Sequence, residues 1–328
     1  MPEALIINDV TYAGEAASQY ITQAIIGLDT FDKGVVYVKD GIKKSLKIKR
    51  IDVSSIFQKR KATPISKGEI NIDGRDLVVE DMMVYFEFNP RDFEDHWDSQ
   101  QLANRLLDAE LPADAESKIM MLTSMRMAEG LEKFAWRARK QYDLEGDAVN
   151  PTSKGDTAEA QDFFYFDGFI KKMLDDSTVV DVSTPTTLTA SNIRAELTRA
   201  IKLLPFALIG DFSKVSILMG KQDFLKYDQA LREDTNKNQD STATSNTRFA
   251  GYPIKVLSGI PENTFVVTNT MASADSNLWV GLNSVDDSLF EINKVANNSE
   301  LWYLKALMKM DVNHGWGTQT VLYTSFTA

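Results

Sequence analysis

Few residues of this chain are suited to acid–base or metal chemistry. The sequence has no cysteine and two histidines, His96 and His314. Asp92 and His96 lie four residues apart, so a helix would place them on one face among further acids, which is a conceivable metal site. The same acids follow Pro90 and would also complement the positive end of a helix dipole, and we favour that structural reading. His314 lies in NHGWG, which predicts a turn between two strands.

The usual catalytic patterns are missing from the sequence. It contains no phosphate-binding G-x-x-x-x-G-K-[ST], no dinucleotide-binding G-x-G-x-x-G and no nucleophile elbow G-x-S-x-G. Two adjacent carboxylate pairs, Asp175-Asp176 and Asp286-Asp287, are of a kind that is common on loops. We therefore predict no catalytic residue, no cofactor and no metal ligand, and we do not expect an enzyme.

Positive charge is concentrated in residues 33–61. This segment has ten basic residues and two acids, Asp40 and Asp52, so it carries +8, whereas the whole chain carries −11 and its remainder −19. A segment of opposite charge either binds an external polyanion or lies on the acidic body of another copy, and both alternatives stay open. The basic residues are Lys33, Lys39, Lys43, Lys44, Lys47, Lys49, Arg50, Lys59, Arg60 and Lys61.

Nucleic acid is the weaker of these two partners. The lysines could contact phosphates while Tyr37 and Phe57 stack on bases. A chain with a net charge of −11 is, however, not expected to have general affinity for nucleic acid. Lysines on an exposed strand also protect it against unwanted sheet pairing, which explains them without any ligand.

Length and composition predict a folded protein with a sizeable core. The chain has 328 residues, of which 43% are hydrophobic, enough for two lobes or one elaborated domain. The lack of cysteine favours a reducing or redox-indifferent setting. We expect no membrane span, because no apolar run approaches about 20 residues, and no export, because MPEALIINDV lacks the order of a signal peptide.

The first part of the chain predicts an arm followed by a β-ribbon. Residues 1–30 show no clear strand or turn pattern, and we interpret them as an arm. From Val35 short β-type runs follow, with Asp40-Gly41 and Asp73-Gly74 as expected hairpin turns. In LKIKRIDV, Leu46, Ile48 and Ile51 alternate with charged residues, which predicts a narrow ribbon with little core of its own. Such a ribbon must rest on something else.

The middle of the chain predicts a long helix. Residues 114–142 contain no proline, and their apolar spacing is that of a helix about 43 Å long, which suggests a structural beam. The polar residues 145–161 predict a boundary or loop. The expected apolar stripe consists of Met121, Met125, Ala128, Leu131, Ala135 and Ala138.

The second half predicts an α/β lobe. Thr189 is placed to cap a helix with Ile193, Leu197, Ile201 and Leu204 on one face, and Pro205 would end it. A strand at 214–219, a helix at 221–231, a polar loop at 232–248 and a strand within 249–259 follow. The runs LFEINKV, ELWYLKALMKMDV and TQTVLYTSF predict closing strands.

Two motifs and the order of these elements resemble the major capsid proteins of tailed bacteriophages, the Hong Kong 97 fold. FDGFIKKML, with Asp167 and Gly168, is similar to the family's D-G-I-L motif. FAGYPIKVLSGIPENTFVVTN, with Gly251, Pro253 and Pro261, is similar to its L-x-G-x-P-V-x-x-x-x-x-M-P strand pair, with Ile260 where methionine is frequent. Glycine permits a backbone conformation closed to larger residues, and proline suits the start of a strand.

The resemblance implies an α+β fold with four parts. These are an N-terminal arm (1–33), an extended β-hairpin loop (34–86), a peripheral domain with a spine helix (87–160 and 276–328) and an α/β axial domain (161–275). Asp167, Gly168, Gly251, Pro253 and Pro261 would be structural residues of the axial domain. The loop would contact a neighbouring subunit through Lys39, Lys43, Lys44, Lys47, Lys49, Arg50, Lys59, Arg60 and Lys61.

The function implied is structural. Copies of the chain would assemble into hexamers and pentamers of an icosahedral phage head that encloses double-stranded DNA, forming in the bacterial cytoplasm and ending in the virion. Partners would be other copies, a portal, possible decoration proteins and a scaffolding protein that is separate or removed, because the ribbon begins by residue 35. No loop lysine is singled out for cross-linking. The alternatives are an encapsulin-like shell for cargo enzymes and a monomeric α/β binding module or hydrolase.

Overall fold

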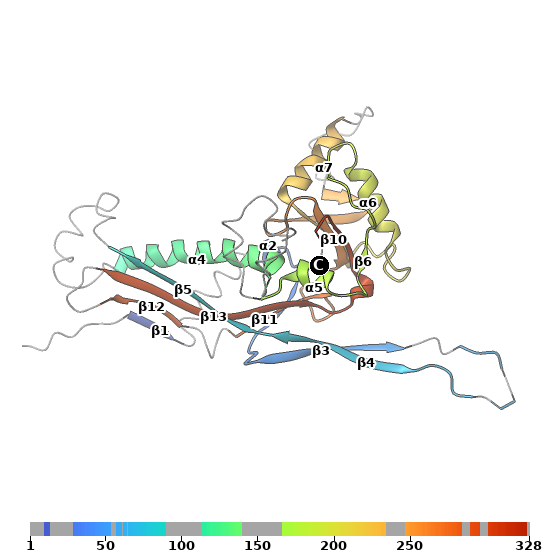
Figure 1. Cartoon of the computed structure of the whole chain (residues 1–328), viewed down its shortest axis with the longest axis horizontal. Helices are drawn as coiled ribbons and strands as arrows, with labels where there is room; N and C mark the ends of the chain where they lie inside the picture. The colour runs from blue at the N-terminus through green and yellow to red at the C-terminus, as the bar shows by residue number, and fades with distance from the viewer. Residues whose placement is uncertain are drawn as a thin grey trace, which may run out of the picture.

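The chain folds into two β-sheets, the helices that cover them and a projecting hairpin (Figure 1). The computed structural model describes residues 10–13, 29–53, 57–60, 62–63, 65–89, 113–139, 166–233, 247–283, 289–295 and 301–326. Most of the predicted arm, the loop at 145–161 and most of the polar loop at 232–248 lie outside these residues. The predicted α+β class is confirmed.

The larger sheet is built around one long strand. β13 (Trp302–His314) pairs antiparallel with β12 (Leu289–Lys294) and β11 (Leu278–Leu282), and β5 (Glu80–Phe88) also pairs with it antiparallel. β1 (Val10–Ala13) extends the sheet beyond β12, and β2 (Tyr37–Lys39) pairs in parallel with β11. Alternate residues of β13, such as Leu304 and Ala306, are buried, so one face of the sheet forms a core.

The long helix covers that face. α4 (Ala113–Arg137) is about 37 Å long and lies along β5 and β13 (Figure 1). The predicted stripe is buried only in part, because Ala128, Leu131 and Ala135 face the core whereas Met121 and Met125 are exposed. Met120 and Met127 are buried in their place. The short helix α2 (Asp29–Asp32) packs on α4, where Thr30 Oγ1 donates to the buried Glu132 carboxylate at 2.6 Å.

The second sheet forms the α/β lobe. Its strand order is β6 (Val180–Asp181), β14 (Val321–Thr324), β10 (Thr264–Asn269), β7 (Val215–Gly220), β9 (Tyr252–Leu257) and β8 (Arg248–Phe249). Every residue of β7 and β10 is buried because both faces are covered. Ile217 packs in the cluster beneath α6 (Ile193–Lys202) and α7 (Lys221–Glu233), while Leu218 packs with α5 (Phe169–Leu174) and the core under α4.

Two details of the predicted lobe differ from the structure. Asn192, not Thr189, is the residue before α6, and Asn192 Oδ1 accepts a hydrogen bond from Thr189 N at 2.8 Å. The sequence predicts a turn at His314, but this residue is the buried last residue of β13, and the turn follows it. A short 3₁₀ helix, η5 (Gly317–Gln319), then leads into β14. No helix in the described part of the chain is long and apolar enough to cross a membrane.

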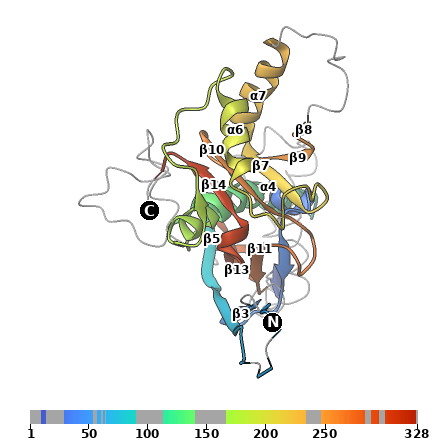
Figure 2. The same cartoon turned by 90° about the vertical axis from the view of Figure 1, so that its right-hand side faces the viewer.

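The hairpin consists of β3 (Ser45–Val53) and β4 (Ile70–Val78), paired antiparallel over all nine residues of each strand. Each strand is about 30 Å long. The hairpin points away from the end of the molecule where α4 begins, and it lies on the opposite side from α6 and α7 (Figures 1 and 2). It is shorter than the predicted loop 34–86, because β2 and β5 are strands of the larger sheet.

Both predicted hairpin turns are wrong. Gly41 does have φ of +78°, but β2 before it pairs with β11 and not with β3. Asp73 and Gly74 lie inside β4, opposite Arg50 and Lys49. Asp-Gly marks a turn only where the flanking segments pair with each other, and here strands distant in sequence compete successfully for them.

Gly251 lies in the bend before β9 with φ of +90°. A Cβ there would come within 2.8 Å of Phe212 Cε1, and the Phe212 ring packs edge-on against Tyr252 at 4.9 Å. Pro253 is the second residue of β9, opposite Arg248 of the short edge strand β8.

Replacing Gly251 with valine should therefore destabilise the subunit by about 1–3 kcal/mol, because a β-branched residue is strained at positive φ and would also displace Phe212. Urea unfolding of the unassembled subunit would measure this loss. Gly210 is the matched control, since it has φ of +87° with open space around it, so Gly210→Val should cost only the backbone strain. Equal stability of Gly251→Val and the parent chain would contradict the prediction.

Candidate intersubunit surface

The two faces of the hairpin differ in what they contact. Leu46 and Ile48 point toward the body of the molecule, whereas Lys47, Lys49 and Ile51 point away from it. At the base of β4, Leu77 is fully buried beside Ile42 and Val79 in a small apolar cluster, to which Leu46 adds from β3. The near end of the hairpin is thus packed on the larger sheet, while its far end extends beyond it (Figure 1).

Hydrogen bonds from β13 fix the base of β4. The backbone N–H of Val78 donates to Asp311 Oδ2 at 2.8 Å, and Asn313 Nδ2 donates to the carbonyl of Asp76 at 2.7 Å. Lys172 of α5 donates to the other oxygen of Asp311 at 2.7 Å. Burial raises the pKa of Asp311, and the Lys172 charge opposes that effect. The alternation that buries one face of β13 in the core therefore turns Asp311 and Asn313 toward the hairpin.

A charged cluster continues this anchor. Arg75 Nη2 donates to Asp176 Oδ2, and His314 Nε2 lies 2.9 Å from the same oxygen. Burial alone would raise the pKa of Asp176. Hydrogen bonds from His314 and Thr178 and the charge of Arg75 outweigh burial, and the pKa is lowered to about 2. Burial also lowers the pKa of His314 to about 4, so this imidazole is neutral at pH 7. We call Arg75, Asp176 and His314 the anchor cluster.

One arginine from each strand of the hairpin binds the turn that follows β13. Arg50 Nη1 and Arg75 Nε donate to the carbonyl oxygen of Gly315 at 2.9 and 3.1 Å. The Arg50 guanidinium also lies 5.5 Å from the centre of the Trp316 ring, a cation–π contact. Arg50, predicted to contact a neighbouring subunit, therefore makes contacts within its own chain.

The remaining predicted loop residues are solvent-exposed. Lys39, Lys43, Lys44, Lys47, Lys49, Lys59 and Arg60 are exposed, and Lys61 lies outside the described residues. Next to Lys49 the outward face becomes apolar, because Ile51 and Ile72 form a cross-strand pair and are 61% and 72% exposed. Phe57 and Ile65, nearer the tip, are also exposed. We call this outward face, from Lys47 to the tip, the hairpin face.

The predicted axial motif residues lie away from the hairpin, with Gly251, Pro253 and Pro261 at the second sheet and Asp167 and Gly168 where α5 meets the end of α4. Gly168 N donates to the carbonyl of Ala138 at 2.8 Å, and a Cβ on Gly168 would lie 2.9 Å from the carbonyl oxygen of Phe134, so glycine permits the close contact between α5 and the end of α4. Asp167 is half-buried next to it, and Pro261 is buried after β9. The structural assignment of these residues to an axial domain stays a prediction.

Sequence reasoning missed most of the anchor. In the sequence Asp176 is marked only by the adjacent Asp175 and His314 only by its turn-like surroundings, and no local pattern marks Arg75. Asp175 is exposed and pairs with Lys171. The described residues contain no group of three acids or histidines that could hold a metal ion. Asp92, His96, Asp286 and Asp287 lie outside the described residues.

Comparison with solved structures identifies the fold. A chain of the satellite phage P4 procapsid, which includes the size determination (Sid) protein, matches with a TM-score of 0.62 at 11% identity, over 96% of this chain and 92% of that one. A capsid chain of the native GTA particle matches at 0.58 and 13%, over 93% and 91%. A virus-like particle chain from Pyrococcus furiosus matches at 0.50 and 9%, over 94% and 98%.

No protein-family model and no curated protein sequence matches this chain. The likeness is therefore one of fold and extends over more than nine tenths of the chain, and the matched chains come from a procapsid, a capsid and a virus-like particle.

The anchor cluster predicts a loss of stability in mild acid. The pKa of His314 is about 4 in the folded protein and 6.5 ordinarily. The contribution of the neutral imidazole to the free energy of unfolding is therefore complete above pH 6.5 and is lost as the pH falls through 4. Between pH 7 and 5 the free energy of unfolding should fall by about 2 kcal/mol more in the parent chain than in His314→Gln. Urea unfolding at the two pH values would measure this. Equal losses in both proteins would show that His314 is not the titrating group.

Proposed function

We propose that this chain, which has the fold of phage capsid proteins, is the major capsid protein of a tailed bacteriophage. Many copies would form hexamers and pentamers of an icosahedral head around double-stranded DNA, without sequence-specific contacts. The observation that carries the proposal is the hairpin, which is anchored at one end and projects from its own chain with isoleucines exposed. The protein would act by assembly and not as an enzyme.

A projecting hairpin of this kind needs a second molecule. Two-stranded ribbons are marginally stable in water, and contiguous exposed apolar side chains mark interaction sites. Lys47 and Lys49 of β3 lie on the face turned away from the body, and Asp76 lies opposite Lys47. A neighbouring copy, whose body is acidic, supplies both the apolar cover and the opposite charge.

The finer assignments rest on the resemblance and are part of the proposal. Residues 1–33 would be the arm, 87–160 with 276–328 the peripheral domain around α4, and 161–275 the axial domain around capsomer centres. Scaffolding, portal and decoration proteins would be the further partners. Assembly would take place in the host cytoplasm.

An encapsulin-like shell is the second candidate. It is favoured by the match to the virus-like particle from Pyrococcus furiosus, because fold alone does not separate a shell for DNA from a shell for other contents. Purified particles distinguish the two, since a phage head would hold double-stranded DNA and an encapsulin-like shell would hold protein cargo.

The proposal predicts that the purified protein forms rings or shells, alone or with a scaffolding protein. Electron microscopy should show closed particles or capsomers, and light scattering should give a mass many times that of the 36.8 kDa chain. A strictly monomeric protein at high concentration, with and without scaffold, would overturn the capsid assignment and favour a monomeric binding module.

Reversing the charge of the hairpin should block assembly without unfolding the subunit. We expect the fourfold variant Lys43→Glu, Lys44→Glu, Lys47→Glu and Lys49→Glu to fold, because all four side chains are exposed, and to fail to form capsomers in moderate salt. A single Lys47→Glu should be nearly silent, since one exposed ion pair contributes about 0–1 kcal/mol.

The matched control replaces the same four lysines with arginine and should assemble normally. Circular dichroism checks the fold, and sedimentation measures assembly. If the fourfold glutamate variant assembles like the parent chain, or loses only DNA binding, the polyanion alternative is correct instead.

A further inference from the structure

Three Asp-Gly pairs in the chain lie in different surroundings. The sequence places them at 40–41, 73–74 and 167–168. An aspartate followed by glycine can close a five-membered ring, in which the backbone nitrogen of the glycine attacks the side-chain carboxyl of the aspartate. Glycine permits this reaction because it has no side chain to hinder the approach. Whether a folded chain allows the reaction depends on how each pair is held.

At the first pair the two reacting groups already lie together. The backbone N–H of Gly41 donates to Asp40 Oδ1 at 2.7 Å, so the nitrogen lies against the carboxyl group that it would attack. A separation of about 3–3.5 Å between reacting atoms is the geometry that accelerates intramolecular reactions. Both residues are exposed to water, and a Cβ on Gly41 would meet no atom within 4 Å. A ring therefore has room to form here.

The other two pairs are confined. Gly74 lies inside strand β4, where a Cβ would come within 2.8 Å of the Lys47 side chain. Gly168 is buried, and its N–H donates to the carbonyl of Ala138 at 2.8 Å. Of the three glycines only Gly41 has a positive φ, of +78°. The same dipeptide thus occurs in one open and two confined environments.

The chain is fixed on both sides of the open pair. Lys39 is paired with Gly281 of β11, and the N–H of Ile42 donates to the carbonyl of Leu282, the next residue of β11, at 3.0 Å. The two residues between these attachment points form a short bulge. A bulge accommodates extra backbone by a local bend, so a longer backbone at this place is compatible with both attachments.

We propose that Asp40 isomerises to isoaspartate in the folded subunit, while the other two Asp-Gly pairs stay intact. A bond forms between Gly41 N and Asp40 Cγ, and the hydroxyl of the protonated carboxyl leaves as water with the amide proton. A water molecule then opens the ring at one of its two carbonyl carbons. Opening at Cγ restores aspartate. Opening at the main-chain carbonyl carbon leaves the backbone running through Cγ, with the former main-chain carboxyl as the side chain.

The product lengthens the backbone by one carbon at the place where β2 leads into the hairpin. Ile42, directly after the bulge, is buried in the apolar cluster with Leu77 and Val79 at the hairpin base. The modification would therefore change the connection to the hairpin with time, without any ligand or enzyme. It needs no second copy of the chain and goes beyond the proposed function.

Incubation of the full chain for several weeks at neutral pH and physiological temperature tests the proposal. The protein is kept dilute and unassembled, isoaspartyl methyltransferase labels the isoaspartate, and peptide mapping locates the label. We expect labelling at residue 40 to exceed that at residues 73 and 167 by roughly tenfold or more, because only there are the reacting groups held together. In the chain unfolded by urea, which lacks these environments, the three pairs should be labelled to a similar extent.

Two variants control for the chemistry. Asp40→Glu keeps the charge but cannot form a five-membered ring, so the label at this position should disappear. Gly41→Ala places a Cβ beside the attacking nitrogen and should reduce the label at residue 40 several-fold, and circular dichroism checks that it folds. Label found mainly at residue 73 or 167, similar label at all three pairs of the folded chain, label confined to the unfolded chain, or undiminished label in Gly41→Ala would each overturn the proposal.

Discussion

The structure depends on one mechanical constraint, which is that a two-stranded ribbon about 30 Å long must be held rigid by contacts at one end. Among the described hydrophobic side chains of β3 and β4, Ile48 and Leu77 are buried and Leu46 is partly buried. The direction of the ribbon is therefore set by polar contacts at its base. Asp311 and Asn313 bond to the β4 backbone, and Arg75 bonds to Asp176 beside His314. A buried network of this kind fixes geometry well, because any shift leaves a charge unpaired.

β13 makes this constraint compatible with a normal core. The side chains on one face of this strand, such as Leu304 and Met310, pack with α4 and the lobe. Near its end the opposite face offers Asp311 and Asn313 to the hairpin, and the strand finishes at His314 in the anchor cluster. The same strand thus connects the helix, the lobe and the hairpin. A displacement of α5, which carries Lys172, would also be felt at the hairpin through Asp311.

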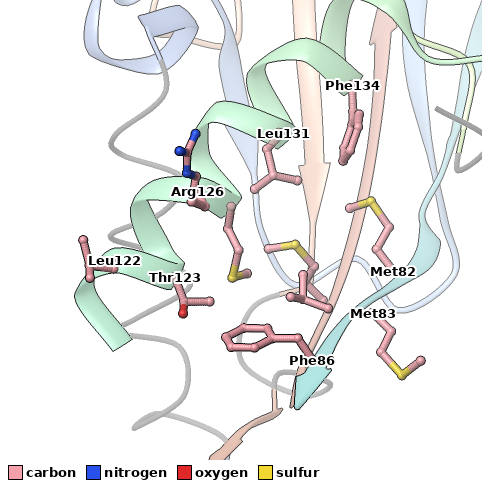
Figure 3. A pocket seen from close by; sticks show the side chains of 12 residues that line it. Met82, Met83, Phe86, Leu122, Thr123, Arg126, Leu131 and Phe134 are labelled. Carbon is pink, nitrogen blue, oxygen red and sulfur yellow. The ribbon is translucent and has the colours of Figure 1, made fainter. Parts of the chain in front are cut away.

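The surfaces left over after folding are consistent with assembly. The hairpin face exposes lysines and isoleucines, and a groove beside α4 is lined by methionines and other apolar residues (Figure 3). Exposed ion pairs add little individually, so the specificity of a contact between subunits lies in many weak charges arranged around apolar side chains. This arrangement suits subunits that must fold alone before they assemble.

The sequence by itself determined the elements whose periodicity is local. It predicted α4, β3, β7, α7 and the closing strands, and the glycine at 251 with its positive φ, because apolar spacing and backbone strain are read over a few residues. Only tertiary structure decided the pairing of β2 with β11, the position of Asp73-Gly74 inside β4 and the inward face of α4, since distant strands and the adjoining sheet compete for those segments. The anchor of Arg75, Asp176 and His314 joins residues up to 239 positions apart along the chain and has no local pattern. The three side chains interact strongly because they are buried together, and a sequence does not show which polar side chains are buried.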